Sequence, residues 1–150
     1  EAKPEEFDFD AIFADADWFH VAGITPAISD SAAALVTEAV KAANEIKAIN
    51  PENGYAYFIL GQSYAASANC SELKCQACYW AAFDMMNKAA GLLAAEPSIQ
   101  ESAKKMAASF RSAFPTKEEC FFNELADGST YVVNCGFAQG VRTTVRPRVQ

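Results

Sequence analysis

The chain has 150 residues, of which 51% are hydrophobic and 21% are charged, and its formal net charge is -7. This composition is typical of a globular domain that can bury a real core, and it excludes a mainly disordered chain. The acidic balance, without a basic stripe, disfavours nucleic acid and anionic membranes as partners. No apolar run reaches the ~18 residues that cross a bilayer, so we expect no membrane insertion.

The charge is unevenly placed along the chain. The first 50 residues hold ten acids and three lysines, a net charge of -7, whereas residues 51–150 hold nine acids and nine bases. Such asymmetry indicates an acidic tail or two segments of different origin. We therefore divide the chain into an acidic segment, residues 1–48, and a helical domain, residues 49–150.

The acidic segment is expected to form a helix, a strand and a second helix. Residues 18–24 are an apolar run of strand length that ends before Thr25-Pro26. Residues 31–48 then carry apolar side chains at helical spacing, after side chains that can cap a helix. Since an unpaired apolar strand is a template for association, we expect it to pair with the C-terminal hairpin, refold as helix or drive dimerisation.

Three more helices are predicted in the second domain, which makes the fold class mainly α. Asn50-Pro51 begins a helix that should run to residue 66, and the polar residues 67–76 indicate a loop before a helix over residues 78–95. Pro97 begins the last long helix, and Pro115 ends it. Six side chains on inward faces should be largely buried, namely Tyr57, Leu60, Tyr64, Phe83, Phe110 and Phe114.

The C-terminal part favours a capped turn of helix and a β-hairpin. Thr116 and Glu119 have the spacing of a capping box. Asp127-Gly128 marks a turn, and residues 129–133 and 141–145 are rich in β-branched and aromatic residues. The predicted fold is therefore a helical bundle with a short N-terminal strand and a C-terminal β-hairpin.

One string in the acidic segment is highly specific, because residues 16–43 read ADWFHVAGITPAISDSAAALVTEAVKAA. Residues 4–45 strongly resemble an internal fragment of 2-keto-3-deoxygluconate kinase, of the ribokinase-like sugar kinase family. The resemblance implies a helix, a central-sheet strand whose Gly23-Ile24 end lies near the sugar pocket, and a covering helix. It also implies a cytoplasmic setting for this part.

Residues 50–147 resemble a second, unrelated family. The strings NPENGYAYFILGQSYAAS, CYWAAFDMMNKA, FPTKEECFF and TTVR are similar to the C-terminal part of tetratricopeptide-repeat proteins of the Bacteroides type, which implies a bacterial envelope or periplasmic setting. The first helix of the repeat has the pattern W-x2-L-G-x2-Y, which is matched here by Tyr57 in place of Trp, Leu60, Gly61 and Tyr64. The second helix has the pattern A-x3-F-x2-A, which is matched by Ala82, Met86 in place of Phe, and Ala89. Gly61 should let the two helices of the repeat approach closely.

The single repeat departs from the family pattern in ways that limit what it implies. The loop between its helices is longer than the standard repeat allows, and about three repeats are needed for a stable array with a continuous groove. We therefore expect the end of an array, or a compact bundle closed by the last long helix and the hairpin.

Kinase chemistry requires parts that this sequence lacks. Phosphoryl transfer needs backbone N–H groups around the phosphates and a base against the attacking hydroxyl. The sugar kinase family supplies them with a Gly-Ala-Gly-Asp motif, whereas none of the seven glycines here forms a G-x-G pair or precedes an Asp. The chain is thus expected to be inactive as a kinase.

Three cysteines lie close together in sequence, Cys70, Cys75 and Cys78, and two more follow at Cys120 and Cys135. An odd count leaves at least one thiol without an intramolecular partner. A disulfide from Cys70 to Cys75 or Cys78, or free thiols, is favoured over a zinc site with Cys120 as fourth ligand, because a second C-x2-C or a His pair is missing.

Two further groups of residues are interpreted as structural. His20, within the apolar run, has no nucleophile or acid at a recognisable spacing, so a packed or surface histidine is favoured over a base. The acids Asp8, Asp10, Asp15 and Asp17 lack the glycine and closing Glu of a calcium loop and indicate a solvated helix face.

Together these patterns favour a non-catalytic helical module for protein interaction or structure, without a cofactor. Its partner is expected to be another protein or a second copy of the chain. The alternative is a sugar kinase of the 2-keto-3-deoxygluconate kinase type, present as an inactive fragment. The two resemblances also indicate a fusion, natural or engineered, with its junction near Lys47.

We predict that the chain neither binds ATP nor phosphorylates 2-keto-3-deoxygluconate, because the phosphate cradle and the base are missing. A ligand at a hundred times its dissociation constant stabilises a protein by about 2.7 kcal/mol, which raises the melting temperature clearly. Thermal unfolding with Mg-ATP and the sugar acid should show no such rise, and a coupled ADP-release assay no turnover. Stabilisation together with turnover would establish the kinase alternative.

Overall fold

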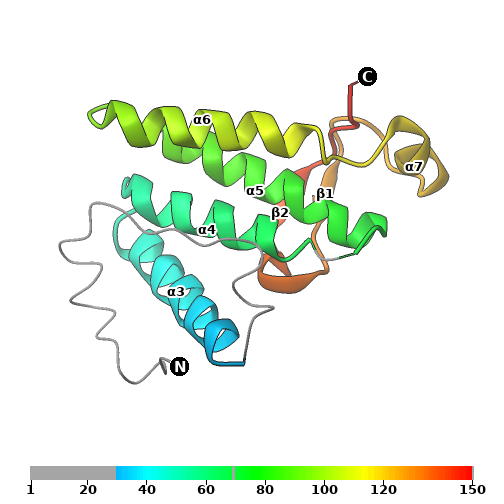
Figure 1. The fold of residues 1–150 in the computed structure, drawn as a ribbon. Coiled ribbons are helices and arrows are strands. Elements are labelled where there is room, and N and C mark those ends of the chain that lie inside the picture. Colours follow the sequence, from blue (N-terminus) through cyan, green and yellow to red (C-terminus); the bar gives the residue numbers. More distant parts are fainter. Residues whose placement is uncertain (1–29, 69, 150) are drawn as a thin grey trace.

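The computed structural model describes residues 30–68 and 70–149 (Figure 1). This part of the chain is mainly helical with a small antiparallel sheet near its C-terminal end, as predicted. The elements are α3 (Asp30–Ile49), α4 (Gly54–Ala66), α5 (Leu73–Leu92), α6 (Pro97–Arg111), α7 (Lys117–Phe122), β1 (Thr130–Val132), the 3-10 helix η2 (Gly136–Ala138) and β2 (Arg142–Thr144). The expected helix before residue 18, the strand over residues 18–24 and His20 lie outside the described residues.

The helices follow one another as packed neighbours. Figure 1 shows α4, α5 and α6 lying alongside one another, with α3 crossing the α4 side and the hairpin behind α5. None of the described helices is both long enough and apolar enough to cross a membrane. The central position of α5 brings α4, α6 and β2 into contact with the same helix.

The boundary predicted at residues 48–49 falls in the last turn of α3, and the side chains of α3 and α4 share one hydrophobic cluster. Val36, Val40 and Ala43 of α3 are buried together with Ala56 and Leu60 of α4. Burial of this shared surface stabilises both helices. The C-terminal helix of the acidic segment is therefore packed on the helical domain.

Helix ends follow local capping chemistry. The Asn53 side chain accepts a hydrogen bond from the Ala56 amide at 3.1 Å, so α4 begins at residue 54, after a turn at Pro51. The predicted capping box of α7 is confirmed. The Glu119 amide donates to Thr116 Oγ1 at 3.1 Å, and the Thr116 amide donates to the Glu119 carboxylate at 2.7 Å.

The loop predicted over residues 67–76 is too long, because α5 already begins at Leu73. Glu72 and Lys74 make this stretch polar in sequence, but both are exposed, while Cys75 and Cys78 face the core. The helical period therefore continues through a segment whose charged residues are on its outward face.

Burial of the six predicted core side chains is only partly as expected. Leu60 (0% exposed), Tyr64 (2%) and Phe114 (3%) are buried. The prediction was wrong for Tyr57, Phe83 and Phe110, which are half-buried. Their helical faces lie at the edge of the core, where the Tyr57 hydroxyl donates to the Pro51 carbonyl at 3.0 Å.

The C-terminal hairpin is confirmed, with shorter strands than predicted. Thr130 pairs with Thr144 and Val132 with Arg142 in antiparallel register. Gly128, at the turn before β1, has a φ of +80°, a conformation that glycine adopts without a steric penalty. Because an isolated two-stranded hairpin is marginally stable, this sheet depends on its packing against α5.

Gly61 lies where α4 packs closely against α5. A Cβ at this position would lie 3.0 Å from Cε and Cγ of Met86 and 3.2 Å from the Ala82 carbonyl oxygen. Met86 and Ala82 are fully buried, so neither has free space into which it can move.

We predict that Gly61→Val destabilises the protein by about 1–3 kcal/mol, since the larger side chain forces the two helices apart. Gly91→Ala is the matched control, because Gly91 is also helical but a Cβ there meets nothing within 4 Å. The control should be neutral or up to about 1 kcal/mol more stable, from its better helix propensity. Urea unfolding measures both changes, and an equal effect of the two substitutions would contradict the close-approach argument.

Candidate functional site

The residues that were predicted to carry a repeat pattern lie on α4 and α5. Leu60 and Tyr64 on α4 are buried, as are Ala82, Met86 and Ala89 on α5. Burial raises the pKa of the Tyr64 hydroxyl, because the charged form loses its hydration. These side chains are part of the core, and they position the surfaces on either side of the helix pair.

A disulfide joins Cys70, just before α5, to Cys75 in its first turn, with the two Cα atoms 5.6 Å apart. Of the alternatives left open by the sequence, Cys75 and not Cys78 is therefore the partner of Cys70. Cys78 is a buried free thiol on the next turn. Within the described residues, no group of three or more His, Cys, Asp and Glu side chains is arranged to hold a metal ion.

Cys135 lies beside this disulfide, although it is far away in sequence. Its Sγ is 3.2 Å from Cys75 Sγ, and the Cys78 thiol lies 3.5 Å from the Cys135 carbonyl oxygen. Cys120, by contrast, is buried in a separate cluster with Trp80 and Phe114. Sequence reasoning grouped the three neighbouring cysteines and missed Cys135, since nothing in its spacing indicates this contact.

A polar cluster anchors the hairpin on α5. Asp84 forms an ion pair with Arg146 at 2.8 Å and accepts a hydrogen bond from the Thr143 hydroxyl at 2.6 Å. One turn earlier, the Trp80 indole N–H donates to the Arg146 carbonyl at 2.7 Å. The guanidinium of Arg146 also lies over the Phe83 ring, 5.3 Å from its centroid. The cluster is a structural clamp, because it links α5 to the chain in and after β2.

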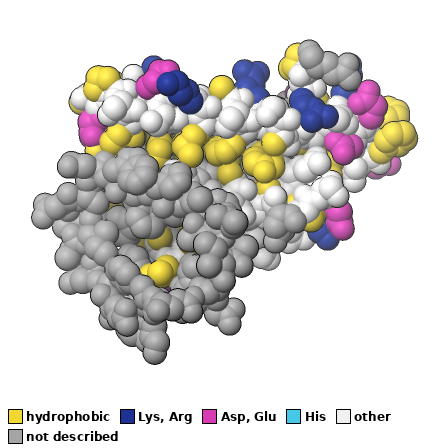
Figure 2. All heavy atoms as spheres, viewed as in Figure 1, with side chains coloured by type: hydrophobic (Ala, Val, Ile, Leu, Met, Phe, Trp, Pro, Cys, Tyr) yellow, Lys and Arg dark blue, Asp and Glu magenta, His cyan; other side chains and the backbone are white. Residues whose placement is uncertain are grey.

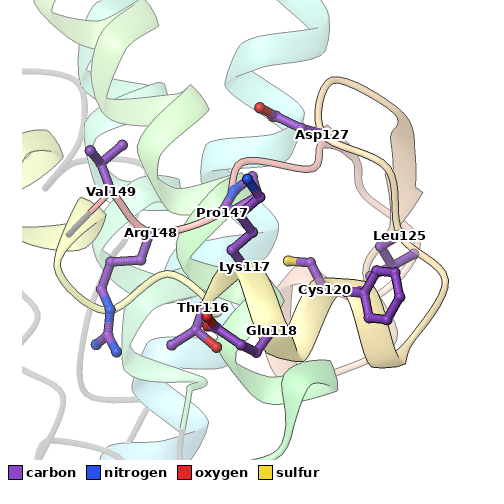
Figure 3. Close-up of a pocket in the computed structure, with 10 residues that line it drawn as sticks. Thr116, Lys117, Glu118, Cys120, Leu125, Asp127, Pro147, Arg148 and Val149 are labelled. Carbon is purple, nitrogen blue, oxygen red and sulfur yellow. The ribbon is translucent and has the colours of Figure 1, made fainter.

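A pocket of about 530 Å³ separates α7 from the C-terminal segment (Figure 3). Figure 3 shows Thr116, Lys117 and Glu118 from the beginning of α7 on one side and Pro147 and Arg148 on the other. The remaining lining residues are Cys120, Phe121, Leu125, Asp127 and Val149. The C-terminal segment is held in place by the Arg148 amide, which donates to the Pro115 carbonyl at 2.8 Å.

Two aromatic side chains next to this pocket are exposed. Phe121 is 77% and Phe122 81% exposed, and their rings contact each other edge to face. Figure 2 shows hydrophobic side chains at the end of the molecule where α7 lies. Large exposed apolar groups that gather in one place are typical of interaction sites.

Charged groups of both signs line the pocket, namely Lys117 and Arg148 and the acids Glu118 and Asp127.

Hydrogen bonds from Thr116 lower the pKa of Glu119, since they favour its charged form. A carboxyl with a lowered pKa stabilises the fold above its ordinary pKa, and the contribution is lost as the pH falls through the lowered value. The capping box that shapes α7 is therefore intact at neutral pH.

A second pocket, of about 320 Å³, adjoins the first along the C-terminal segment. Arg111, Arg146 and Arg148 line it, together with Phe114 and Val149. The two pockets share Pro147, Arg148 and Val149, so a pocket with charges of both signs lies next to one that is lined by three arginines.

Comparison with known proteins identifies no relative. No protein-family profile matches the chain, and neither a curated protein nor a solved structure is significantly similar to it. Functional interpretation therefore depends on the geometry described above.

We predict that Asp84→Ala destabilises the protein by about 1–3 kcal/mol, because it leaves the partly buried Arg146 and Thr143 without their shared acceptor. Glu101→Ala is the control, since Glu101 pairs with Lys105 at 3.7 Å on an exposed face of α6. An exposed pair of this kind contributes at most about 1 kcal/mol. Urea unfolding compares the two, and equal stability losses would show that the clamp is no stronger than a surface ion pair.

Proposed function

We propose that the chain is a non-catalytic helical module that binds protein through its α7 end. The observation that carries this proposal is the exposed pair Phe121 and Phe122 on a short, firmly capped helix beside a pocket. Aromatic side chains lose little conformational entropy on binding and supply much apolar contact area, which makes them frequent hot spots of protein interfaces.

The α4–α5 pair supports a tetratricopeptide-like relationship for residues 49–150. Gly61 allows the close approach that the repeat requires, and Ala82, Met86 and Ala89 occupy the facing positions on α5. A repeat unit buries its remaining apolar surface on neighbours. A chain with one such hairpin is therefore suited to association with other protein.

The occupant that we propose for the α7 end is a second copy of this chain. The lining of the larger pocket balances Lys117 and Arg148 against Glu118 and Asp127, whereas the charged residues that line the adjoining pocket are all arginines, Arg111, Arg146 and Arg148. The first 50 residues of the chain carry a net charge of -7. Charge complementarity between this acidic third of one copy and the arginine-lined pocket beside the α7 end of another would orient the encounter. The exposed phenylalanines would then supply the apolar contact.

The test is sedimentation velocity of the full chain over a concentration series, at low and at high salt. We expect reversible self-association that weakens as salt screens the charges. The double substitution Phe121→Ser and Phe122→Ser should weaken it at least about tenfold, which corresponds to about 1.4 kcal/mol. Circular dichroism establishes that the variant keeps its helices.

Val132→Thr is the matched control, because Val132 is an exposed apolar residue on β1, outside the pocket. It should leave self-association unchanged. A wild-type chain that stays monomeric at every concentration in low salt would refute the second copy as the occupant. Equal weakening by the control would refute the α7 end as the surface.

A further inference from the structure

Four cysteines meet where the loop before α5 contacts the η2 segment. Cys70 and Cys75 form the disulfide, and Cys135 Sγ lies 3.2 Å from Cys75 Sγ. Cys78 completes the group through its contact with the Cys135 carbonyl. Thiol–disulfide exchange proceeds by attack of a thiolate on one sulfur of a disulfide, and this arrangement places a free thiol beside one such sulfur.

The position of Cys135 is built by the surrounding backbone. The Phe137 amide donates to Ser67 Oγ at 2.9 Å, which docks the η2 segment on the end of α4. Gly136 has a φ of +52°, and a Cβ there would lie 2.3 Å from the Ser67 Cβ. Only glycine permits this conformation at this distance. The segment that carries Cys135 is therefore held against the disulfide by more than the sulfur contact itself.

Cys78 and Cys120 are less suited than Cys135 to attack this disulfide. Burial, and next the neighbouring Cys135, raise the pKa of Cys78 to about 12, so its thiol stays protonated at neutral pH. Burial also raises the pKa of Cys120, which lies in a different cluster. Of the three free cysteines among the described residues, Cys135 is the one that is not fully buried.

We propose that Cys70, Cys75 and Cys135 form an intramolecular thiol–disulfide exchange site in which Cys75 changes partner. The Cys135 thiolate attacks Cys75 Sγ and forms the Cys75–Cys135 bond. The Cys70–Cys75 bond breaks, its electron pair leaves on the Cys70 sulfur, and Cys70 takes up the proton that Cys135 lost. One disulfide and one thiol are present before and after, so no oxidant or reductant is consumed.

The exchange replaces a local link by a long-range one. The Cys70–Cys75 bond spans a sequence separation of 5, whereas Cys75 and Cys135 are 60 residues apart. A disulfide that closes a longer loop restricts the unfolded chain more strongly and stabilises the fold more. The new bond would join the η2 segment to α5. It would leave a thiol at Cys70, which is half-buried in the loop before α5.

The test maps disulfides in the full oxidised chain after free thiols are blocked at low pH. Trypsin cuts after Lys74, so residues 48–74, 75–88 and 118–142 fall on separate peptides that carry Cys70, Cys75 and Cys135. We expect two linked species, one for each partner of Cys75. Fragment spectra distinguish Cys75 from Cys78 and Cys135 from Cys120. A Cys70–Cys75 link alone would overturn the proposal.

Two substitutions sharpen the result. Cys70→Ser, oxidised with oxidised glutathione, should carry the Cys75–Cys135 bond in most molecules, and its melting temperature should exceed that of its reduced form by several degrees. Cys135→Ser should carry only the Cys70–Cys75 bond, while the control Cys120→Ala keeps both linked species. Glutathione adducts in Cys70→Ser, without a Cys75–Cys135 bond, would also overturn the proposal.

Discussion

The rest of the structure depends on the close packing of α4 against α5 at Gly61. Because the helices meet there with no space for a Cβ, α5 is buried by α4 on one side and by α6 on the other. Small, fully buried residues allow neighbouring elements to pack closely on several faces of α5, among them Ala77, Ala81 and Ala89. A helix that is apolar around most of its circumference is stable only as the centre of a bundle.

The hairpin packs on this central helix and is held there by its side chains. The indole of Trp80 donates to the chain that follows β2 and packs edge to face against Tyr131, with ring centroids 5.5 Å apart. Asp84, one turn further along α5, holds Arg146 and Thr143. Hydrogen bonds to charged groups in a partly buried setting are stronger than those between neutral groups. A pair of three-residue strands is ordered here because α5 supplies these partners.

The two proposed sites both lie on the part of the chain that runs from the hairpin to residue 149. Cys135 precedes η2, between the strands, and Pro147 to Val149 form one wall of the α7 pocket after β2. A bond from Cys75 to Cys135 would fix the hairpin covalently to α5, the helix that also carries Asp84. The choice of disulfide partner by Cys75 and the order of the binding surface would then be coupled through the same strands.

The sequence by itself determined the helical bundle, the capping box of α7, the terminal hairpin and the burial of Leu60, Tyr64 and Phe114. These features depend on local signals, such as helical period, a Thr and Glu three residues apart, and β-branched residues around glycine turns. The early beginning of α5 was missed because Glu72 and Lys74, which make that stretch polar in sequence, are exposed, while Cys75 faces the core.

Only the tertiary structure decided which residues form the candidate sites. Cys135 lies beside Cys75, and Arg146 beside Asp84, because the chain returns to α5 after sixty residues or so. The pocket exists because α7 and residues 147–149 meet. Neither sequence contains a motif that predicts its contact with the other. Side-chain spacing reports which face of an element is buried, but contacts across such distances arise from loop closure and packing, for which the local sequence carries no signal.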